Sequence, residues 1–193
     1  MSDAAADPLA LASRAGLPPE FLYLREAFPR ERWTAGGLHP TARRWLHMHG
    51  GFRAHQAEMA AMVEAWRAGA TDVPALHRAL IPALQQFLQH LDGHHRIESG
   101  HYFPALQRLE PRIAPGIDLL DRDHDAIHAH IEAMVVTGRA LHQAVTGGAP
   151  DAADRVERLA DVLALAGPQL ARHLDDEEEI VIPLIALRGD PLG

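Results

Sequence analysis

The sequence contains no cysteine, and this absence excludes several classes of protein. Without thiols the chain cannot form disulfides, thiolate zinc sites, cysteine-ligated iron–sulfur clusters or a cysteine nucleophile. Any metal that the protein binds must therefore be held by nitrogen and oxygen ligands. The chain has 14 histidines against only 2 tyrosines and 3 tryptophans. Imidazole is the commonest metal ligand among side chains, so this excess favours a metal-binding function.

Long apolar runs and an excess of basic residues are also missing. No stretch approaches the apolar length of a membrane span, which is about 18 residues or more. Residues 1–17 lack the basic start and apolar core of a signal peptide. The formal net charge is −8, which disfavours a nucleic-acid-binding surface. We therefore expect a soluble cytoplasmic protein without a nucleic-acid or membrane partner, and the oligomeric state is left open.

Hydrophobic periodicity predicts an all-α protein. At 193 residues the chain fits one domain, and strand-like alternation and hairpin signals are missing. Long amphipathic helices joined by short loops predict an antiparallel up-down-up-down four-helix bundle. Pro82 is expected to mark a kink or a restart, and Pro168 is expected to interrupt the last helix. The helices are expected at residues 41–67, 73–109, 117–145 and 150–187.

The chain is divided into a short N-terminal extension, residues 1–38, and the bundle, residues 39–189. Residues 1–17 are expected to be partly disordered, because termini without anchoring contacts seldom order. From Pro18 to His39, aromatic residues alternate with prolines and glycines. This composition predicts a short helix and a loop that pack over one end of the domain. A partner-binding arm is the alternative interpretation.

Two copies of one motif organise the sequence. His94 and Glu98 are four residues apart in HHRIESGHYFP, and His173 and Glu177 have the same spacing in HLDDEEEIVIP. Residues four apart lie on one face of a helix, so each copy aims an imidazole and a carboxylate at the same region. Iron, manganese and zinc accept such ligands. Two copies facing each other across a bundle would begin to build a two-metal site, whereas solvated helix faces are the alternative.

The other two helices offer further histidines near their apolar stripes. His49 and His55 lie on the first expected helix, and His124 and His128 form another four-residue pair on the third. Each half of the chain thus resembles one helical hairpin, with a histidine on its first helix and the His–Glu pair on its second. A histidine on an apolar face is more often a hydrogen-bonded core residue, and this alternative applies to His55 and His128.

Three more histidines lie beside the first His–Glu pair. His90 and His101 are reserve ligands, because each is displaced along the helix or around it from His94. His95 lies about 100° around the helix from His94, so we expect it to be exposed.

This order of histidines and carboxylates resembles the hemerythrin-like (HHE cation-binding) family over about residues 40–188. The resemblance implies a four-helix bundle that holds two non-haem iron ions as a di-iron centre with an oxo or hydroxo bridge. It implies that histidines are terminal ligands and that two glutamates bridge the irons. The implied metal ligands are His49, His94, Glu98, His124, His128, His173 and Glu177.

The second bridging carboxylate is the point where the chain departs from the respiratory hemerythrins. In those proteins it follows its histidine by five residues, a position that Glu178 occupies here. Helical geometry favours Glu177, which lies about 40° around the helix from His173, whereas Glu178 lies about 140° away. The internal repeat also matches Glu98 with Glu177.

The resulting functional hypothesis is a non-haem di-iron protein that binds O₂, or a related small ligand such as peroxide or NO, for oxygen or redox sensing or handling. The alternative is a di-iron oxidase or peroxidase, for which Tyr102 could supply a phenol near the centre. A third is a structural bundle with adventitious metal. The sequence does not distinguish reversible binding from turnover, so enzyme activity is left open.

Overall fold

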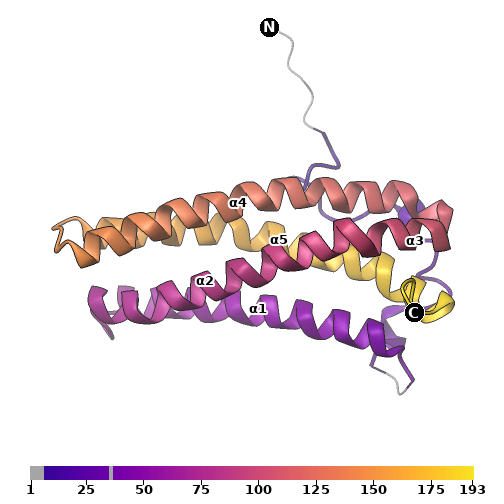
Figure 1. Cartoon of the computed structure of the whole chain (residues 1–193), viewed down its shortest axis with the longest axis horizontal. Coiled ribbons are helices and arrows are strands. Elements are labelled where there is room, and N and C mark those ends of the chain that lie inside the picture. The colour runs from indigo at the N-terminus through magenta and orange to yellow at the C-terminus, as the bar shows by residue number, and fades with distance from the viewer. Residues whose placement is uncertain (1–6, 35–36) are drawn as a thin grey trace, which may run out of the picture. The chain divides into compact units, whose positions relative to one another are not determined.

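The computed structural model of the chain describes residues 7–34 and 37–193, which contain helices and irregular segments but no strand. Figure 1 shows the long helices as continuous ribbons. A π-helical turn, η3 (Glu98–Tyr102), continues α2 into the short helix α3 (Phe103–Leu109). In the described ranges no helix is both long and apolar enough to cross a membrane. The four long helices are α1 (Pro40–Arg67), α2 (Val73–Ile97), α4 (Ala114–Thr146) and α5 (Ala152–Arg188).

The predicted helices agree closely with these bounds, and the all-helical class is confirmed. Pro82 lies inside α2, which continues past it without a restart. Pro168 lies inside α5, which is likewise continuous, so the prediction that this proline interrupts the last helix is wrong. A proline removes one backbone donor, and the packed turns on both sides of it keep the helix together.

Local signals in the sequence explain where the helices begin and end. The Asp72 side chain caps α2, because its Oδ1 accepts a hydrogen bond from the backbone N–H of Ala75 at 2.8 Å. Gly69 and Gly148 follow α1 and α4 with φ angles of 73° and 66°. This left-handed conformation favours glycine and ends a helix in a tight turn.

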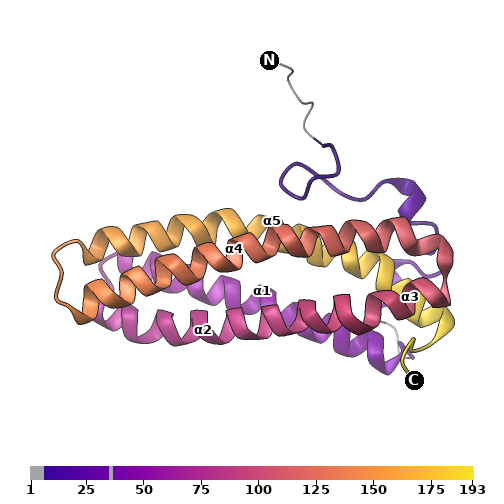
Figure 2. The same cartoon turned by 45° about the horizontal axis from the view of Figure 1, so that its top comes forward.

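The chain forms two compact units, consistent with a helical bundle: unit 2 contains a segment of all four long helices, and unit 1 contains segments of α1, α4 and α5 together with η3 and α3. Unit 1 comprises the described residues up to His49 together with residues 96–126 and 169–193. Unit 2 comprises residues 50–95 and 127–168. Unit 2 includes the short turn between α4 and α5, which Figure 2 shows. Apolar side chains of every helix segment are buried in unit 2, among them Phe52, Met59, Leu80, Phe87, Met134, Leu141, Val156 and Leu159.

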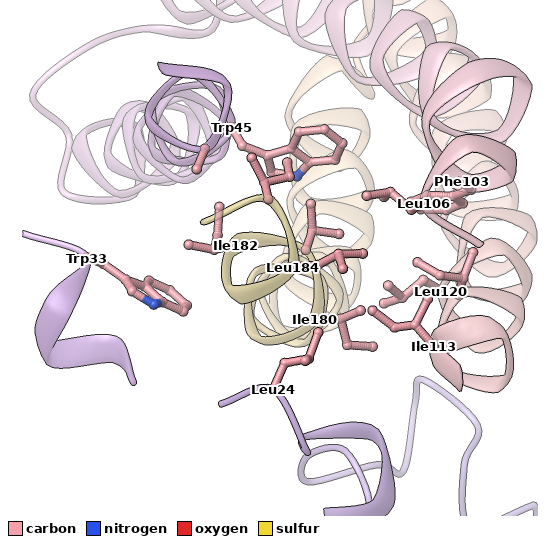
Figure 3. Packing of buried hydrophobic residues seen from close by; sticks show 14 of the residues in the cluster. Leu24, Trp33, Trp45, Phe103, Leu106, Ile113, Leu120, Ile180, Ile182 and Leu184 are labelled. Atoms are coloured by element: carbon pink, nitrogen blue, oxygen red, sulfur yellow. The ribbon is translucent and has the colours of Figure 1, made fainter. Parts of the chain in front are cut away.

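In unit 1 the end of α5 is enclosed by apolar side chains on more than one side. Ile180, Ile182 and Leu184 of α5 are all buried. Figure 3 shows them near the middle of the cluster, with Trp45 of α1 and Leu24 among the labelled residues around them. A helix that is buried all round belongs to a protein interior.

The cover on the outer side of α5 comes from residues 7–34, called here the N-terminal segment. It contains two 3₁₀ turns, η1 (Pro19–Phe21) and η2 (Arg30–Arg32). Residues 1–6, for which disorder was expected, lie outside the described residues. Leu11 and Arg14 are buried, however, so the expectation of a loose chain does not hold for these two residues. The division at residues 1–38 and 39–189 stays a prediction.

Candidate metal centre

Three histidines and two glutamates with closely spaced ligand atoms are buried in the interior of unit 1. They come from α1, the first residue of η3, α4 and α5. The ligand atoms of His49, Glu98 and Glu177 lie within 4.8 Å of one another, and those of His124 and His173 do so as well. Their exposed fractions are 0% for His49, His173 and Glu177, 1% for Glu98 and 7% for His124.

Glu177 faces two histidines with different oxygens. Its Oε1 lies 3.7 Å from Nε2 of His49, and its Oε2 lies 3.3 Å from Nε2 of His173. The second carboxylate, Glu98, places Oε2 3.6 Å from Nε2 of His124. The Nε2 atoms of all three histidines therefore face carboxylate oxygens.

The opposite ring nitrogen of each histidine contacts a different polar group. Nδ1 of His49 lies 3.1 Å from Oε1 of Glu178. Nδ1 of His173 lies 3.4 Å from Oδ2 of Asp123, and Nδ1 of His124 lies 2.9 Å from Oγ of Ser99. An ionised carboxylate can only accept, so a neutral imidazole at His49 or His173 would carry its proton on Nδ1 and leave the lone pair of Nε2 for a metal.

Aromatic side chains surround these polar groups. Trp45 Nε1 donates a hydrogen bond to Oε1 of Glu177. The ring of Phe103 stacks on His124 with centroids 5.2 Å apart, and Tyr102 meets Trp45 edge-on at 4.9 Å. These rings limit the access of water, which strengthens every electrostatic interaction inside.

The electrostatics of unit 1 indicate a place for positive charge. Burial, followed by the charge of Glu177, raises the pKa of Glu98 well above its ordinary value. Burial alone lowers the pKa of His173, but hydrogen bonds and charges from Asp123 and Glu177 raise it to about 9. Burial raises the pKa of Asp123, but His173 and Arg14 outweigh it and hold that pKa below the usual range. Protons on Glu98 and His173 offset crowded negative charge, and a bound cation would displace them.

Of the predicted ligands, the structure brings together His49, Glu98, His124, His173 and Glu177. His94 is buried on α2, one helical turn before Glu98 on a continuous helical segment. Its ring also packs against Phe52 with centroids 5.1 Å apart.

His128 does not belong to this buried set. Its side chain is 55% exposed, and it lies 3.5 Å from Glu132 and 3.9 Å from Asp92. The buried residue at this level of α4 is Ile127, so His128 points away from the packed face. The four-residue step from His124 carries a side chain about 40° further around the helix, enough to leave a narrow buried stripe.

His95 was expected to be exposed, and this expectation is wrong, since the residue is 7% exposed. Leu91, His94, His95 and Glu98 are all buried and have the i, i+3, i+4, i+7 spacing of a broad packed face. The buried arc of this helix is therefore wide enough to include both adjacent histidines. Two other histidines considered as reserve ligands, His90 and His101, are exposed.

Several groups around the site were not foreseen from the sequence. They are Arg14, Trp45, Ser99, Asp123 and Asp176. Asp123 and Asp176 directly precede His124 and Glu177 in the chain, which is the only local signal that could have identified them. Arg14 had no such signal.

The donor set suits a borderline divalent metal. Three imidazole nitrogens and two carboxylates, all buried, match the ligand preferences of iron, manganese or zinc better than those of calcium or magnesium. The second nitrogen of each histidine is already engaged, as metal-ligating histidines require.

Comparison with known proteins agrees with this chemistry. Residues 41–188 match the family model of the hemerythrin HHE cation binding domain. No curated protein and no solved structure was found to match the chain. The matched range includes all five buried candidate ligands and leaves the N-terminal segment outside.

Proposed function

Since the chain belongs to the hemerythrin HHE cation-binding domain family, we propose that it holds two iron ions and uses them to bind O₂ or a related small ligand. Peroxide and NO are the related ligands, and oxygen or redox sensing or handling is the role. The observation that carries the proposal is the position of Glu177, whose two oxygens face His49 and His173 separately. A carboxylate with this arrangement suits a bridge between two ions.

We propose that His49, Glu98, His124, His173 and Glu177 form the core of the ligand set. His94, which is buried on α2, stays a predicted ligand. His128 is omitted because it is exposed. The proposed topology is the antiparallel one, supported by the short connections at residues 68–72 and 147–151.

Iron held by these residues would supply the chemistry that binds O₂, peroxide or NO. The protein's part is to orient and shield this centre. Glu178, Ser99 and Asp123 hold the outer ring nitrogens of three histidines. Trp45 donates to Glu177 and fixes one carboxylate oxygen.

A second candidate function is a di-iron oxidase or peroxidase. One observation favours it: the ring of the half-buried Tyr102 contacts the ring of Trp45 edge-on, and Trp45 in turn donates a hydrogen bond to Glu177. Phenol and indole side chains can be oxidised, and such a pair beside the site could supply electrons for turnover.

The test begins with anaerobic reconstitution of the full chain with Fe(II) and elemental analysis. We expect close to two irons per chain; a value near zero in folded protein would refute iron binding. Oxygen is then added to the reduced protein while its optical spectrum and oxygen consumption are followed. A spectral change that reverses when oxygen is removed supports binding, whereas continued consumption with a reductant supports the oxidase.

A further inference from the structure

Arg14 is a buried cation that comes from outside the matched domain. It lies in the N-terminal segment, and the family match begins only at residue 41. Its side chain is 1% exposed, although arginine is almost never fully buried unless it is paired. Covering the surface of α5 does not by itself explain why this charged side chain is buried.

The guanidinium of Arg14 makes a forked contact with Asp123 of α4. NH2 lies 2.5 Å from Oδ2 of Asp123, and NH1 lies 3.2 Å from Oδ1. A third nitrogen, Nε, donates to Oδ2 of Asp176 at 2.8 Å. NH1 also donates to the backbone carbonyl of Leu9 at 2.7 Å. The planar group thus holds one carboxylate at both oxygens and a second at one oxygen, a geometry that lysine cannot reproduce.

Asp123 links this cation to the candidate metal centre. The Oδ2 atom that Arg14 contacts also lies 3.4 Å from Nδ1 of His173. The other nitrogen of this histidine, Nε2, faces Oε2 of Glu177 at 3.3 Å. The orientation of the His173 ring therefore depends on Asp123, and the orientation of Asp123 depends on Arg14.

We propose that Arg14 is a positioning residue for the centre, acting through Asp123 on the imidazole of His173. The proposal rests on the proposed function, because the ring is positioned for a metal. Its forked contact keeps Asp123 from rotating, so that Nδ1–H of His173 stays hydrogen-bonded and Nε2 stays directed inward. The N-terminal segment thereby contributes to a centre whose ligands all belong to the matched domain.

Arg172 provides a matched control. It also pairs with Asp176, at 2.6 Å from NH2 to Oδ1, and it donates to the carbonyl of Ala15 at 3.0 Å. Among its contacts there is none with Asp123. Arg172→Gln therefore weakens the same Asp176 contact and the attachment of the N-terminal segment, but leaves the Arg14–Asp123–His173 connection in place.

The first measurement is Fe(II) affinity of the full chain, by anaerobic competition with a chromogenic chelator. Loss of an outer hydrogen-bonding partner typically lowers metal affinity about 10–100-fold. We expect Arg14→Gln to fall in that range and Arg172→Gln to stay within about twofold of the parent protein. Equal affinities for the two variants, whether both reduced or both unchanged, would overturn the proposal.

The second measurement needs no metal. In ¹⁵N-histidine-labelled, metal-free protein, solvent exchange of the Nδ1 proton of His173 reports its contact with Asp123. We expect Arg14→Gln to accelerate this exchange and to leave the Nδ1 proton of His49 unaffected. Unchanged exchange at His173 would refute the positioning role. If the parent protein takes up no iron, the proposed function is refuted, but this exchange experiment still shows whether Arg14 positions the His173 ring.

Arg14→Lys keeps the experiment conclusive if Arg14→Gln does not fold. The lysine retains the positive charge beside Asp123 and Asp176 but cannot form the fork. We expect a folded protein with weakened iron affinity and faster exchange at His173. Parental values for both quantities in this variant would show that charge alone suffices and would overturn the positioning role of the fork.

Discussion

Exchange of Glu177 and Glu178 for glutamine, one at a time, is the sharpest test of the metal centre. The two residues are neighbours in the chain and both are buried, with exposed fractions of 0% and 4%. Glutamine keeps the size of glutamate and removes only its charge and one oxygen. Glu177 faces Nε2 of both His49 and His173, whereas Glu178 contacts Nδ1 of His49 at 3.1 Å. The first would be a ligand and the second would orient a ligand.

The expected magnitudes differ because of these contacts. Glu178→Gln loses an outer carboxylate of one histidine, which costs about 10–100-fold in affinity. Glu177→Gln removes the negative charge and replaces one of the two carboxylate oxygens, so the contacts with both His49 and His173 are weakened. If the weakening at each histidine costs at least as much as the loss of an outer partner, the factors multiply to about 10²–10⁴ in affinity, or about 3–5 kcal/mol.

The assay is anaerobic Fe(II) titration against a chelator of known affinity, followed by elemental analysis after desalting. Glu178→Gln should still fill with iron at high free Fe(II), whereas Glu177→Gln should retain less than the parent protein under the same conditions. Helical circular dichroism checks that both variants remain folded. Equal losses, or a larger loss for Glu178→Gln, would refute the assignment of Glu177 as the bridging carboxylate.

Three further predictions test the site and the fold. His124→Ala should lower iron content and His128→Ala, at an exposed residue, should not; elemental analysis that shows equal losses would contradict the placement of His128. Because the pKa of Glu98 is raised in the folded state, stability is lost as pH rises from the ordinary glutamate range through that raised pKa. Metal-free Glu98→Gln should therefore resist urea better than the parent protein at neutral pH and equally at about pH 4; a variant that is less stable at both would refute the burial argument. Leu174→Ala, at a fully buried leucine, should lower the free energy of unfolding by about 2–5 kcal/mol. Leu165→Ala, at a leucine that is 62% exposed, should change the free energy of unfolding by less than about 0.5 kcal/mol. Similar losses for the two variants would show that burial does not determine the loss of stability.

The helices were predictable because their signal is local. Apolar residues at helical spacing, an aspartate cap and glycines at the turns determine where each helix lies. Pro168 shows the limit of such signals, since α5 continues through it. Packing of the flanking turns outweighs the lost hydrogen bond. This packing involves residues far apart in the chain, so a local sequence pattern does not predict it.

The burial of the candidate ligands was predictable to the extent that they follow a four-residue spacing. Spacing places His94 with Glu98 and His173 with Glu177, but it does not say how wide the buried arc of a helix is. His95 is buried and His128 is exposed for this reason. The width depends on which neighbouring elements cover a helix, and these contacts join residues far apart in the chain.

Unit 1 carries a charge imbalance that a bound cation would correct. Its buried carboxylates are Glu98, Asp123, Asp176, Glu177 and Glu178, and among the described residues Arg14 is the buried arginine. Arg14 is engaged by Asp123 and Asp176, and Glu178 also has Arg30 at 3.8 Å. Glu98 and Glu177 face histidines and each other, and the raised pKa of Glu98 reflects this crowding. Buried carboxylates destabilise a fold unless they are paired or coordinate a metal. A purely structural bundle gains nothing from such a cluster, whereas a metal-binding protein requires it.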